Sequence, residues 1–381
     1  MPTAALDSTL AAPANALQAV THADPAPYYA QLAATRPCFF DDALGWWVAA
    51  SASAVDAVLG NAACQVRPAD EPVPKAIAAS PTGTFFRRLA RQIDGPDHDS
   101  RKAAVMQVLG QLDVSALATR AHQQASAAWS DATCLTAALH ADAHLRIPLA
   151  TIAHILLGDD ADAAACQTDI AAYLAALGAG ANAAVVAEAD AAVARLQDRF
   201  ANAPLASDGD DADVSNLAAL LAQTYDACAG LLGNCIVALS RHVGLVACLR
   251  THPQAIERFV TEVLRRDAPV QNTRRFVSRD TELAGQALRP GDRILVLLAA
   301  ANVDAAANAD PLRFDIDRTQ PRLWTFGAGP HRCPAEVLAT VIARESVQHL
   351  LNLPNVDQWL IDLGEVAYRP SPNARIPVFH A

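Results

Sequence analysis

One stretch near the C-terminus restricts the possible folds of this 381-residue chain more than any other. It runs from Trp324 to Ala335, reads Trp-Thr-Phe-Gly-Ala-Gly-Pro-His-Arg-Cys-Pro-Ala, and leads into a segment with a helical pattern. The two glycines let the backbone approach a flat partner closely, and an aromatic ring packs well beside a sulfur atom. A cysteine at a helix N-terminus is favoured as a thiolate. The stretch therefore predicts a ligand-binding cysteine loop, the plainer alternative being a glycine-rich turn with a buried free thiol.

The composition favours a large helical protein. Apolar residues make up 52% of the chain, charged residues 18% and aromatic residues only 5%, which favours helices packed closely through small side chains. The net charge of -11 disfavours nucleic acid and an anionic membrane as partners. Residues 1–20 lack the basic start and long apolar core of a signal peptide or anchor, and the eight cysteines show no metal-like spacing. We therefore expect a cytoplasmic protein with free thiols and no membrane partner.

Turn and helix signals divide the chain into helical and sheet-rich parts. We expect sheet-rich parts at about 30–65 and 270–320, and a helical body at about 85–268 and 333–352. The run Trp46–Ala49 fits a strand or a helix, and we place it in a small sheet. Residues 286–296 predict a strand, a turn and a strand. The apolar run 214–242 predicts a long buried helix, in which Asp226 is an unusual acid.

The cysteine loop resembles the haem-binding loop of the cytochromes P450, Phe-Gly-x-Gly-x-His-x-Cys. The matching positions are Phe326, Gly327, Gly329, His331 and Cys333. In that family the cysteine thiolate is the axial ligand of the haem iron, so the resemblance implies a haem b cofactor with Cys333 as the metal ligand. Ala335 stands where the family usually has glycine, a change expected to tighten the helix start without removing the ligand.

Glu262 and Arg265 extend the resemblance. Taken alone, a Glu-x-x-Arg pair is common on solvated helices. Its position before a sheet-rich region and upstream of the cysteine loop matches the P450 family, in which the pair has a structural role. The resemblance covers most of the chain after about residue 81. It implies a mainly helical P450-like fold with a smaller sheet-rich region, in a single domain over residues 1–381.

Four further positions match family residues that hold the two haem propionates. His98 and Lys102 resemble a His-x-x-x-Arg pair, with lysine keeping the charge but losing the planar fork of arginine. Arg275 and His331 are the other two. The plain alternative for Lys102 and Arg275 is a surface charge.

The central helix departs from the family pattern. Most P450 monooxygenases carry Ala/Gly-Gly-x-Asp/Glu-Thr there, and the acid and alcohol help to deliver protons during oxygen activation. The aligned residues here are Gln223-Thr224-Tyr225-Asp226-Ala227, which keep the acid and lose the alcohol. We expect Gln223, Thr224 or the substrate to replace the lost function, or peroxide to be used directly. A one-residue shift would make Cys228 the relevant residue, and a thiol is a poorer donor.

The family's substrate-contacting regions indicate a functionalised small molecule as substrate. The corresponding residues are Thr82, Phe85, Gln223, Val270, Gln271, Asn272 and Pro372. Gln271 and Asn272 are polar where apolar side chains would suit a fatty or terpene substrate.

The resemblance implies a monooxygenase that oxidises a small biosynthetic metabolite. Electrons are expected from a separate ferredoxin or flavodoxin that docks at a surface including Arg101 and Arg332, and the protein is expected to be a monomer. Two alternatives stay open. One is a peroxide-using or non-oxygenating enzyme, such as a peroxygenase, dehydratase or isomerase. The other is a haem-binding homologue without turnover.

Overall fold

The computed structural model describes residues 11–130, 142–178, 180–203, 211–242 and 244–379. Its helices are α1 (Ala26–Thr35), α2 (Ala52–Leu59), α3 (Pro81–Arg87), α4 (Pro96–Gly110), α5 (Val114–Trp129), α7 (Ala143–Leu157), α8 (Ala163–Ala176), α9 (Ala183–Ala201), α10 (Asp211–Arg241), α11 (Gly244–Thr251), α12 (Ile256–Arg266), α13 (Leu298–Asn302), α14 (Glu336–Leu351) and α15 (Val356–Asp362). Short 3-10 turns are η1 (Gln18–Thr21), η2 (Lys75–Ile77), η3 (Ala90–Gln92), η4 (Pro253–Ala255) and η5 (Gly329–His331).

The strands form one five-stranded sheet and two small hairpins. They are β1 (Cys38–Asp41), β2 (Trp46–Ala49), β3 (Cys64–Gln65), β4 (Thr273–Val277), β5 (Thr281–Leu283), β6 (Gln286–Leu288), β7 (Arg293–Val296), β8 (Ala367–Tyr368) and β9 (Pro377–Val378). The larger sheet has the order β1-β2-β7-β4-β3, with β2 and β7 parallel and the other neighbours antiparallel. A mainly helical fold with a smaller sheet-rich region is therefore confirmed. The expected strand, turn and strand at 286–296 are present as β6 and β7, but the two strands belong to different sheets because β6 pairs with β5.

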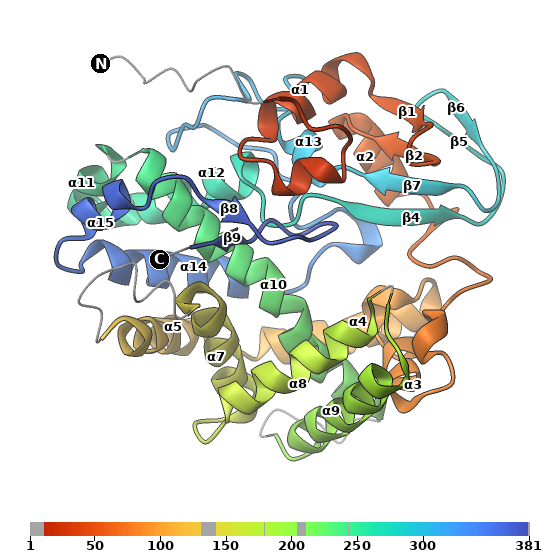
Figure 1. Cartoon of the computed structure of the whole chain (residues 1–381), viewed down its shortest axis with the longest axis horizontal. Coiled ribbons are helices and arrows are strands. Elements are labelled where there is room, and N and C mark those ends of the chain that lie inside the picture. Colours follow the sequence, from red (N-terminus) through yellow and green to blue (C-terminus); the bar gives the residue numbers. More distant parts are fainter. Residues whose placement is uncertain (1–10, 131–141, 179, 204–210, 243, 380–381) are drawn as a thin grey trace.

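Helix α10 is the central element of the molecule. In Figure 1 it runs between the sheet-rich upper part, which carries α1 and α2, and the lower helices α3, α8 and α9. Two glycines on this helix allow close packing against the C-terminal segment. A Cβ atom at Gly230 would lie 2.7 Å from the carbonyl oxygen of Arg375, and one at Gly233 would lie 2.8 Å from Pro377 Cδ. The long apolar run in the sequence therefore forms the core helix that its composition predicts.

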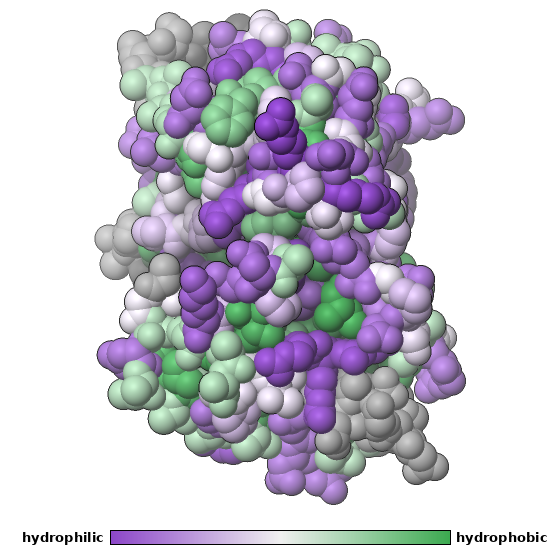
Figure 2. Space-filling view, turned by 90° about the vertical axis from the view of Figure 1, so that its right-hand side faces the viewer, coloured by the Kyte–Doolittle hydropathy of each residue, from purple (hydrophilic) through white to green (hydrophobic). Residues whose placement is uncertain are grey.

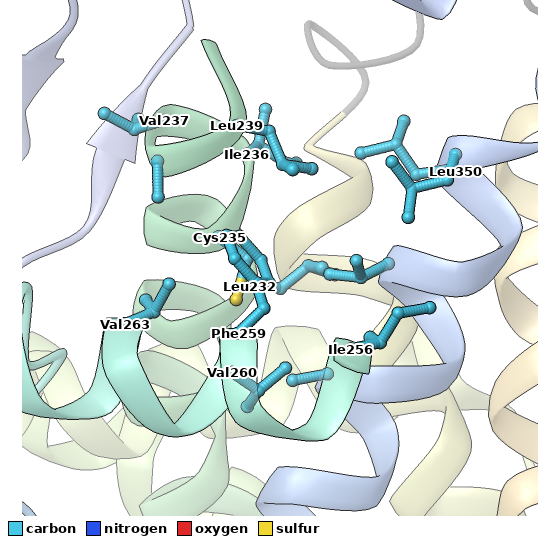
Figure 3. Packing of buried hydrophobic residues seen from close by; sticks show 14 of the residues in the cluster. Leu232, Cys235, Ile236, Val237, Leu239, Ile256, Phe259, Val260, Val263 and Leu350 are labelled. Carbon is cyan, nitrogen blue, oxygen red and sulfur yellow. The ribbon is translucent and has the colours of Figure 1, made fainter. Parts of the chain in front are cut away.

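The largest apolar cluster joins α10 to α12 and α14. Figure 3 shows Leu232 and Cys235 of α10 beside Phe259 of α12, and Leu350 of α14, farther off in this view, belongs to the same cluster. All four side chains are buried. Helix α12 carries the Glu262–Arg265 pair, and α14 begins just after the cysteine loop. This cluster therefore holds both elements against one core.

Hydrophilic side chains dominate the face seen in Figure 2, where apolar side chains form small separate patches. Within the described ranges, no single helix is long and apolar enough to cross a membrane. Residues 214–241 and 244–251 pass the test of length and composition only as a pair, and that pair is bent by 113°.

A buried histidine is expected to make folding stability depend on pH. His144 on α7 is 2% exposed and packs edge-on against Phe379, with ring centroids 5.0 Å apart. Burial lowers the pKa of His144 to about 4. The unfolded chain therefore binds a proton near its ordinary pKa of about 6.5, while the folded chain resists protonation until about pH 4. Stability is thus fully present above about pH 6.5 and is lost as the pH falls, by about 2 to 3 kcal/mol near pH 4.5.

The measurement compares the free energy of unfolding of the wild type and His144→Leu at about pH 7 and about pH 4.5, by denaturant titration. At the lower pH the free energy of unfolding should fall more for the wild type than for His144→Leu. The contributions of other acid-sensitive groups are common to both proteins and cancel in the difference. His252→Gln, at an exposed position, is the matched control. A gap between wild type and His144→Leu that stays constant with pH would rule out this role.

Candidate haem site

The cysteine loop has the backbone geometry that its glycines allow. Gly327 and Gly329 have φ values of +71° and +66°, and a Cβ atom at Gly329 would lie 2.6 Å from the carbonyl oxygen of Leu59. The Cys333 N–H donates to the Phe326 carbonyl oxygen at 2.8 Å, which closes the loop on itself. Ala335 has a φ of −100°, so its side chain adds no backbone strain where the family usually has glycine.

Opposing influences act on the Cys333 thiol. Burial raises its pKa, whereas the Ala335 backbone N–H and the nearby cations Arg91 and Lys102 favour the thiolate. Burial is the largest of these influences, so the helix N-terminus alone does not produce the thiolate that the sequence pattern suggests. A coordinated metal ion deprotonates a thiol outright, so such a partner would supply the thiolate form here.

A cavity of about 490 Å³ separates the cysteine loop from α10. Cys333 and Phe326 line one side, and Gln223, Ala227 and Cys228 line the other. The spacing of the α10 residues is that of one helix face. The volume of the cavity lies within the usual range for small-molecule and cofactor sites, about 300 to 1,000 Å³.

The four residues predicted to hold propionates gather at one end of this cavity. His98 and Lys102 of α4 both contact the Pro330 carbonyl oxygen, His98 through Nε2 at 3.1 Å, and Lys102 Nζ also donates to the Arg332 carbonyl oxygen at 2.8 Å. The His98 and His331 rings lie 4.0 Å apart between centroids. Arg275 lines the cavity as well, so all four residues are in its wall.

The charges of Lys102 and Arg275 lack carboxylate partners within hydrogen-bond distance among the described residues. Arg275 is only 6% exposed, yet its Nη1 donates only to the Arg274 carbonyl oxygen at 2.8 Å and, at 3.4 Å, to the Thr273 hydroxyl. His331 Nε2 contacts Asp94 Oδ1 at 3.0 Å. A buried cation without a counter-ion is costly, so these side chains fit a group that brings two carboxylates, as haem does.

The polar residues of α10 near the cavity differ in whether their side chains already have hydrogen-bond or ion-pair partners. The Thr224 hydroxyl donates to the Leu220 carbonyl oxygen at 2.6 Å. Gln223 lines the cavity, and its amide has no hydrogen-bond partner in the described parts of the chain. Asp226 does not line the cavity and instead pairs with Arg369. Burial, together with Cys333, raises the pKa of Cys228 to about 12, so its thiol stays protonated.

Of the predicted substrate contacts, four line the cavity and three do not. Gln223, Val270, Asn272 and Pro372 are in its wall. Thr82 donates to Asp190 Oδ1 through N at 2.8 Å and Oγ1 at 2.7 Å, which fastens α3 to α9. Phe85 packs edge-on against Tyr173, with centroids 5.3 Å apart. Gln271 donates to the Ala268 carbonyl oxygen at 2.7 Å and is absent from the wall.

The sequence reasoning missed several polar residues of the cavity wall, among them Arg67, Arg91 and Asn216. No local pattern marks them, because they meet only when the segment before α4 folds across α10.

Glu262 and Arg265 form a buried bidentate ion pair. Arg265 Nε donates to Glu262 Oε2 at 2.8 Å, and Arg265 Nη2 donates to Glu262 Oε1 at 2.7 Å. The Arg265 side chain is 0% exposed and the Glu262 side chain 2% exposed. Arg265 also donates to the Pro311 and Arg313 carbonyl oxygens at 2.7 and 3.0 Å. The Thr325 hydroxyl of the cysteine loop donates to the Leu264 carbonyl oxygen at 2.6 Å. The pair thus braces α12 against the segment that leads into the loop.

A second hollow of about 660 Å³ lies on the other side of the cysteine. Its wall includes Cys333 and the apolar residues Met106, Val114 and Val337, which are 48%, 48% and 53% exposed. Arg332 is in the same wall, where it pairs with Glu336 at 2.7 Å. This hollow is an accessible surface next to the proposed ligand sulfur.

Comparison with known proteins gives consistent matches. Residues 251–353 match the family described as Cytochrome P450. A putative cytochrome P450 133B2 of Xylella fastidiosa is 36% identical over 154 residues, which cover 39% of this chain and 38% of that protein. The biotin biosynthesis cytochrome P450 of Bacillus subtilis is 33% identical over 147 residues, 38% of this chain and 36% of that protein. The matched parts thus span under two fifths of these relatives.

Solved structures share the fold over nearly the whole chain. P450BioI, in complex with hexadec-9Z-enoic acid ligated acyl carrier protein, has a TM-score of 0.78 at 20% identity and covers 93% of this chain and 96% of its own. CalO2 has a TM-score of 0.76 at 23% identity, with coverage of 93% and 94%. The chain therefore has the fold of these cytochrome P450 structures, and its residues 251–353 match the cytochrome P450 family, whose members bind haem through a cysteine thiolate.

Proposed function

We propose that this protein is a haem-thiolate oxidoreductase of the monooxygenase type, a single domain over residues 1–381 in which Cys333 ligates the iron of haem b. The observation that carries the proposal is that the Cys333 loop shares one cavity with Lys102 and Arg275, which have no carboxylate within hydrogen-bond distance among the described residues. His98, Lys102, Arg275 and His331 would hold the propionates. Bound through a thiolate, haem supplies electron transfer and the activation of dioxygen. The substrate proposed is a small, functionalised biosynthetic metabolite that contacts Val270, Asn272 and Pro372.

Gln223 is proposed as the polar group that replaces the missing alcohol. It lies on α10 one helical turn before Ala227, and both residues face the cavity. Its amide can donate and accept at once, so it would be able to hold a water molecule on the α10 side of the cavity. Thr224 is less suited because its hydroxyl already donates to Leu220. Asp226, paired with Arg369 outside the wall, stays a predicted proton source.

Electrons are proposed to come from a separate ferredoxin or flavodoxin that docks over the hollow beside Cys333. The exposed Met106, Val114 and Val337 offer apolar contact there, and Lys102 and Arg332 in its wall offer positive charge. Arg101, which precedes Lys102 on α4, is proposed to add to that charge. A monomer in the cytoplasm remains the prediction from sequence.

Gln223→Ala is expected to lower the coupling of electron use to product by about tenfold and to release more peroxide, because a positioned proton donor is lost. Ala227→Thr should leave native turnover unchanged or lower, since it duplicates or crowds that function. Thr224→Val removes a hydroxyl that is already engaged, so it serves as the matched control and should keep wild-type coupling. The measurement is product formed per electron pair, with peroxide titrated in parallel. A clear rise in native turnover for Ala227→Thr, with less peroxide released, would mean that the site is an impaired version of the ordinary machinery.

The peroxide-using alternative is tested by replacing the electron supply. Wild-type holoprotein is assayed once with NADPH, a ferredoxin and its reductase, and once with hydrogen peroxide alone. Our proposal expects product in the first assay at the higher rate. Product formed only with peroxide would favour a peroxygenase, and no turnover of any ligand that shifts the Soret band would favour the non-catalytic alternative.

A further inference from the structure

The cavity is strongly basic although the chain is acidic overall. The basic residues in its wall, apart from histidines, are Arg67, Arg91, Lys102, Arg274, Arg275 and Arg332. Among the described residues that line the cavity there is no aspartate or glutamate, against a net charge of -11 for the whole chain. Such a concentration of one sign of charge raises the local concentration of ligands of the opposite sign.

Haem and local partners account for four of these six cations. Lys102 and Arg275, with His98 and His331, are the proposed propionate partners. Arg332 pairs with Glu336 at 2.7 Å, and the Arg274 guanidinium lies 5.3 Å from the centroid of the Trp46 ring. Two propionates already have four partners, so haem needs neither Arg67 nor Arg91, although Arg67 also has local partners in the Glu71 carboxylate at 3.8 Å and the Phe86 ring at 5.5 Å.

Arg91 is the freer of the two. It has no hydrogen bond or ion pair within the ranges that the structure describes. Arg91 lies in the cavity wall, and its side chain is exposed in the structure. Its guanidinium is therefore accessible to a ligand that enters the cavity.

The backbone that carries Arg91 is held from both sides. The Ala90 N–H donates to Asn216 Oδ1 at 2.8 Å, and Asn216 Nδ2 donates to the Arg88 carbonyl oxygen at 2.9 Å. On the other side, His98 Nδ1 contacts the Ala90 carbonyl oxygen at 2.9 Å. Asn216 is 4% exposed and belongs to α10, so the η3 turn is fixed to the central helix. A charged group on a fixed turn binds a ligand with less loss of entropy.

Arg67 adds a second cation beside this turn. The Val66 N–H donates to Asp94 Oδ2 at 3.0 Å, which places residues 66–67 next to the end of the η3 segment. Arg67 Nη2 donates to the Glu71 carbonyl oxygen at 2.8 Å, but the Glu71 carboxylate is 3.8 Å away. The Arg67 Nε atom is buried without a hydrogen-bond partner among the described residues.

We propose that Arg91, supported by Arg67, binds an anionic group of the substrate, so that the substrate is a small acid with an apolar body. This inference rests on the proposed function and specifies its substrate class. The planar guanidinium matches the two oxygens of a carboxylate or a phosphate monoester. Leu220, Leu231 and Val270 in the same cavity wall offer apolar contact to the rest of the molecule.

The test titrates ferric holoprotein with decanoic acid, decyl phosphate, methyl decanoate and decanol, and follows the Soret band. The two acids distinguish a carboxylate from a phosphate site, and the neutral compounds have matched chains. Wild type is expected to bind one of the acids at least about tenfold more tightly than both neutral compounds, with the preference reduced by high salt. Arg91→Gln should lose that preference at full haem content, and Arg91→Lys should restore part of it. Arg87→Gln, the same change at an exposed site outside the wall, should behave as wild type.

Three results would overturn the inference while leaving the proposed function intact. The first is wild-type holoprotein that binds the neutral compounds as tightly as the acids. The second is an Arg91→Gln variant that keeps the acid preference. The third is Arg91→Gln protein that loses haem, because Arg91 would then be a propionate partner. Failure of the proposed function itself looks different, since the wild type would then carry no haem-thiolate signal before any ligand is added.

Discussion

Cys333→Ser protein is expected to lose the thiolate-specific absorption of its reduced carbon monoxide complex, and its turnover should fall to background. The hydroxyl of serine is nearly always protonated and is a poorer iron ligand than a thiolate, whose electron donation favours oxygen cleavage. The loop itself should persist, because the Cys333 N–H bond to the Phe326 carbonyl oxygen involves only backbone atoms. The measurement is haem content together with the reduced carbon monoxide spectrum and product formation.

Cys228→Ser is the matched control for that substitution. Cys228 lies across the same cavity on α10, and its thiol is buried and protonated. The control should keep the thiolate-specific band and at least part of the activity. If Cys228→Ser lost the band and Cys333→Ser kept it, the assignment of the ligand would be wrong.

Glu262→Ala is expected to give little folded holoprotein. Arg265 is 0% exposed, and removal of its carboxylate partner leaves a buried charge that only carbonyl oxygens contact. Breaking a buried pair in this way costs about 3 to 5 kcal/mol, a large part of the stability of most domains. Glu257→Ala, an exposed position on the same helix, should be close to wild type. The measurement is the yield of soluble protein and its free energy of unfolding.

A second variant separates folding from catalysis at this pair. Glu262→Gln keeps the shape and part of the hydrogen bonding to Arg265, so more protein should fold than with Glu262→Ala. Whatever holoprotein is obtained should then turn over substrate normally per haem. Normal yield and haem content with lost activity would contradict the structural role of the pair.

The cysteine loop and the Glu262–Arg265 pair could be recognised because their residues are close in sequence and their spacing is a direct consequence of local geometry. The mainly helical fold was likewise predictable from the apolar run that forms α10. The pairing of β7 with both β2 and β4, and of β6 with β5 instead, was not predictable, since it depends on contacts between distant segments.

The directions of side chains at the site could not be predicted from the sequence. Gln223 and Asp226 were both placed in the central motif, but the rotation of α10 turns Gln223 to the cavity and Asp226 to Arg369. Thr82 and Phe85 face α9 and α8 because Asp190 and Tyr173 offer them partners there. Arg91 reaches the cavity only through the bonds of Asn216 and His98 to its turn. Tertiary contacts of this kind leave no local pattern.

The most direct test of the central claim is the spectrum of the reduced wild-type protein under carbon monoxide, recorded with its haem content. If Cys333 is the axial ligand, the protein binds one haem per chain and absorbs at the thiolate-specific position. A protein that purifies without haem and cannot be reconstituted, or one whose complex absorbs where imidazole-ligated haem does, would contradict the account.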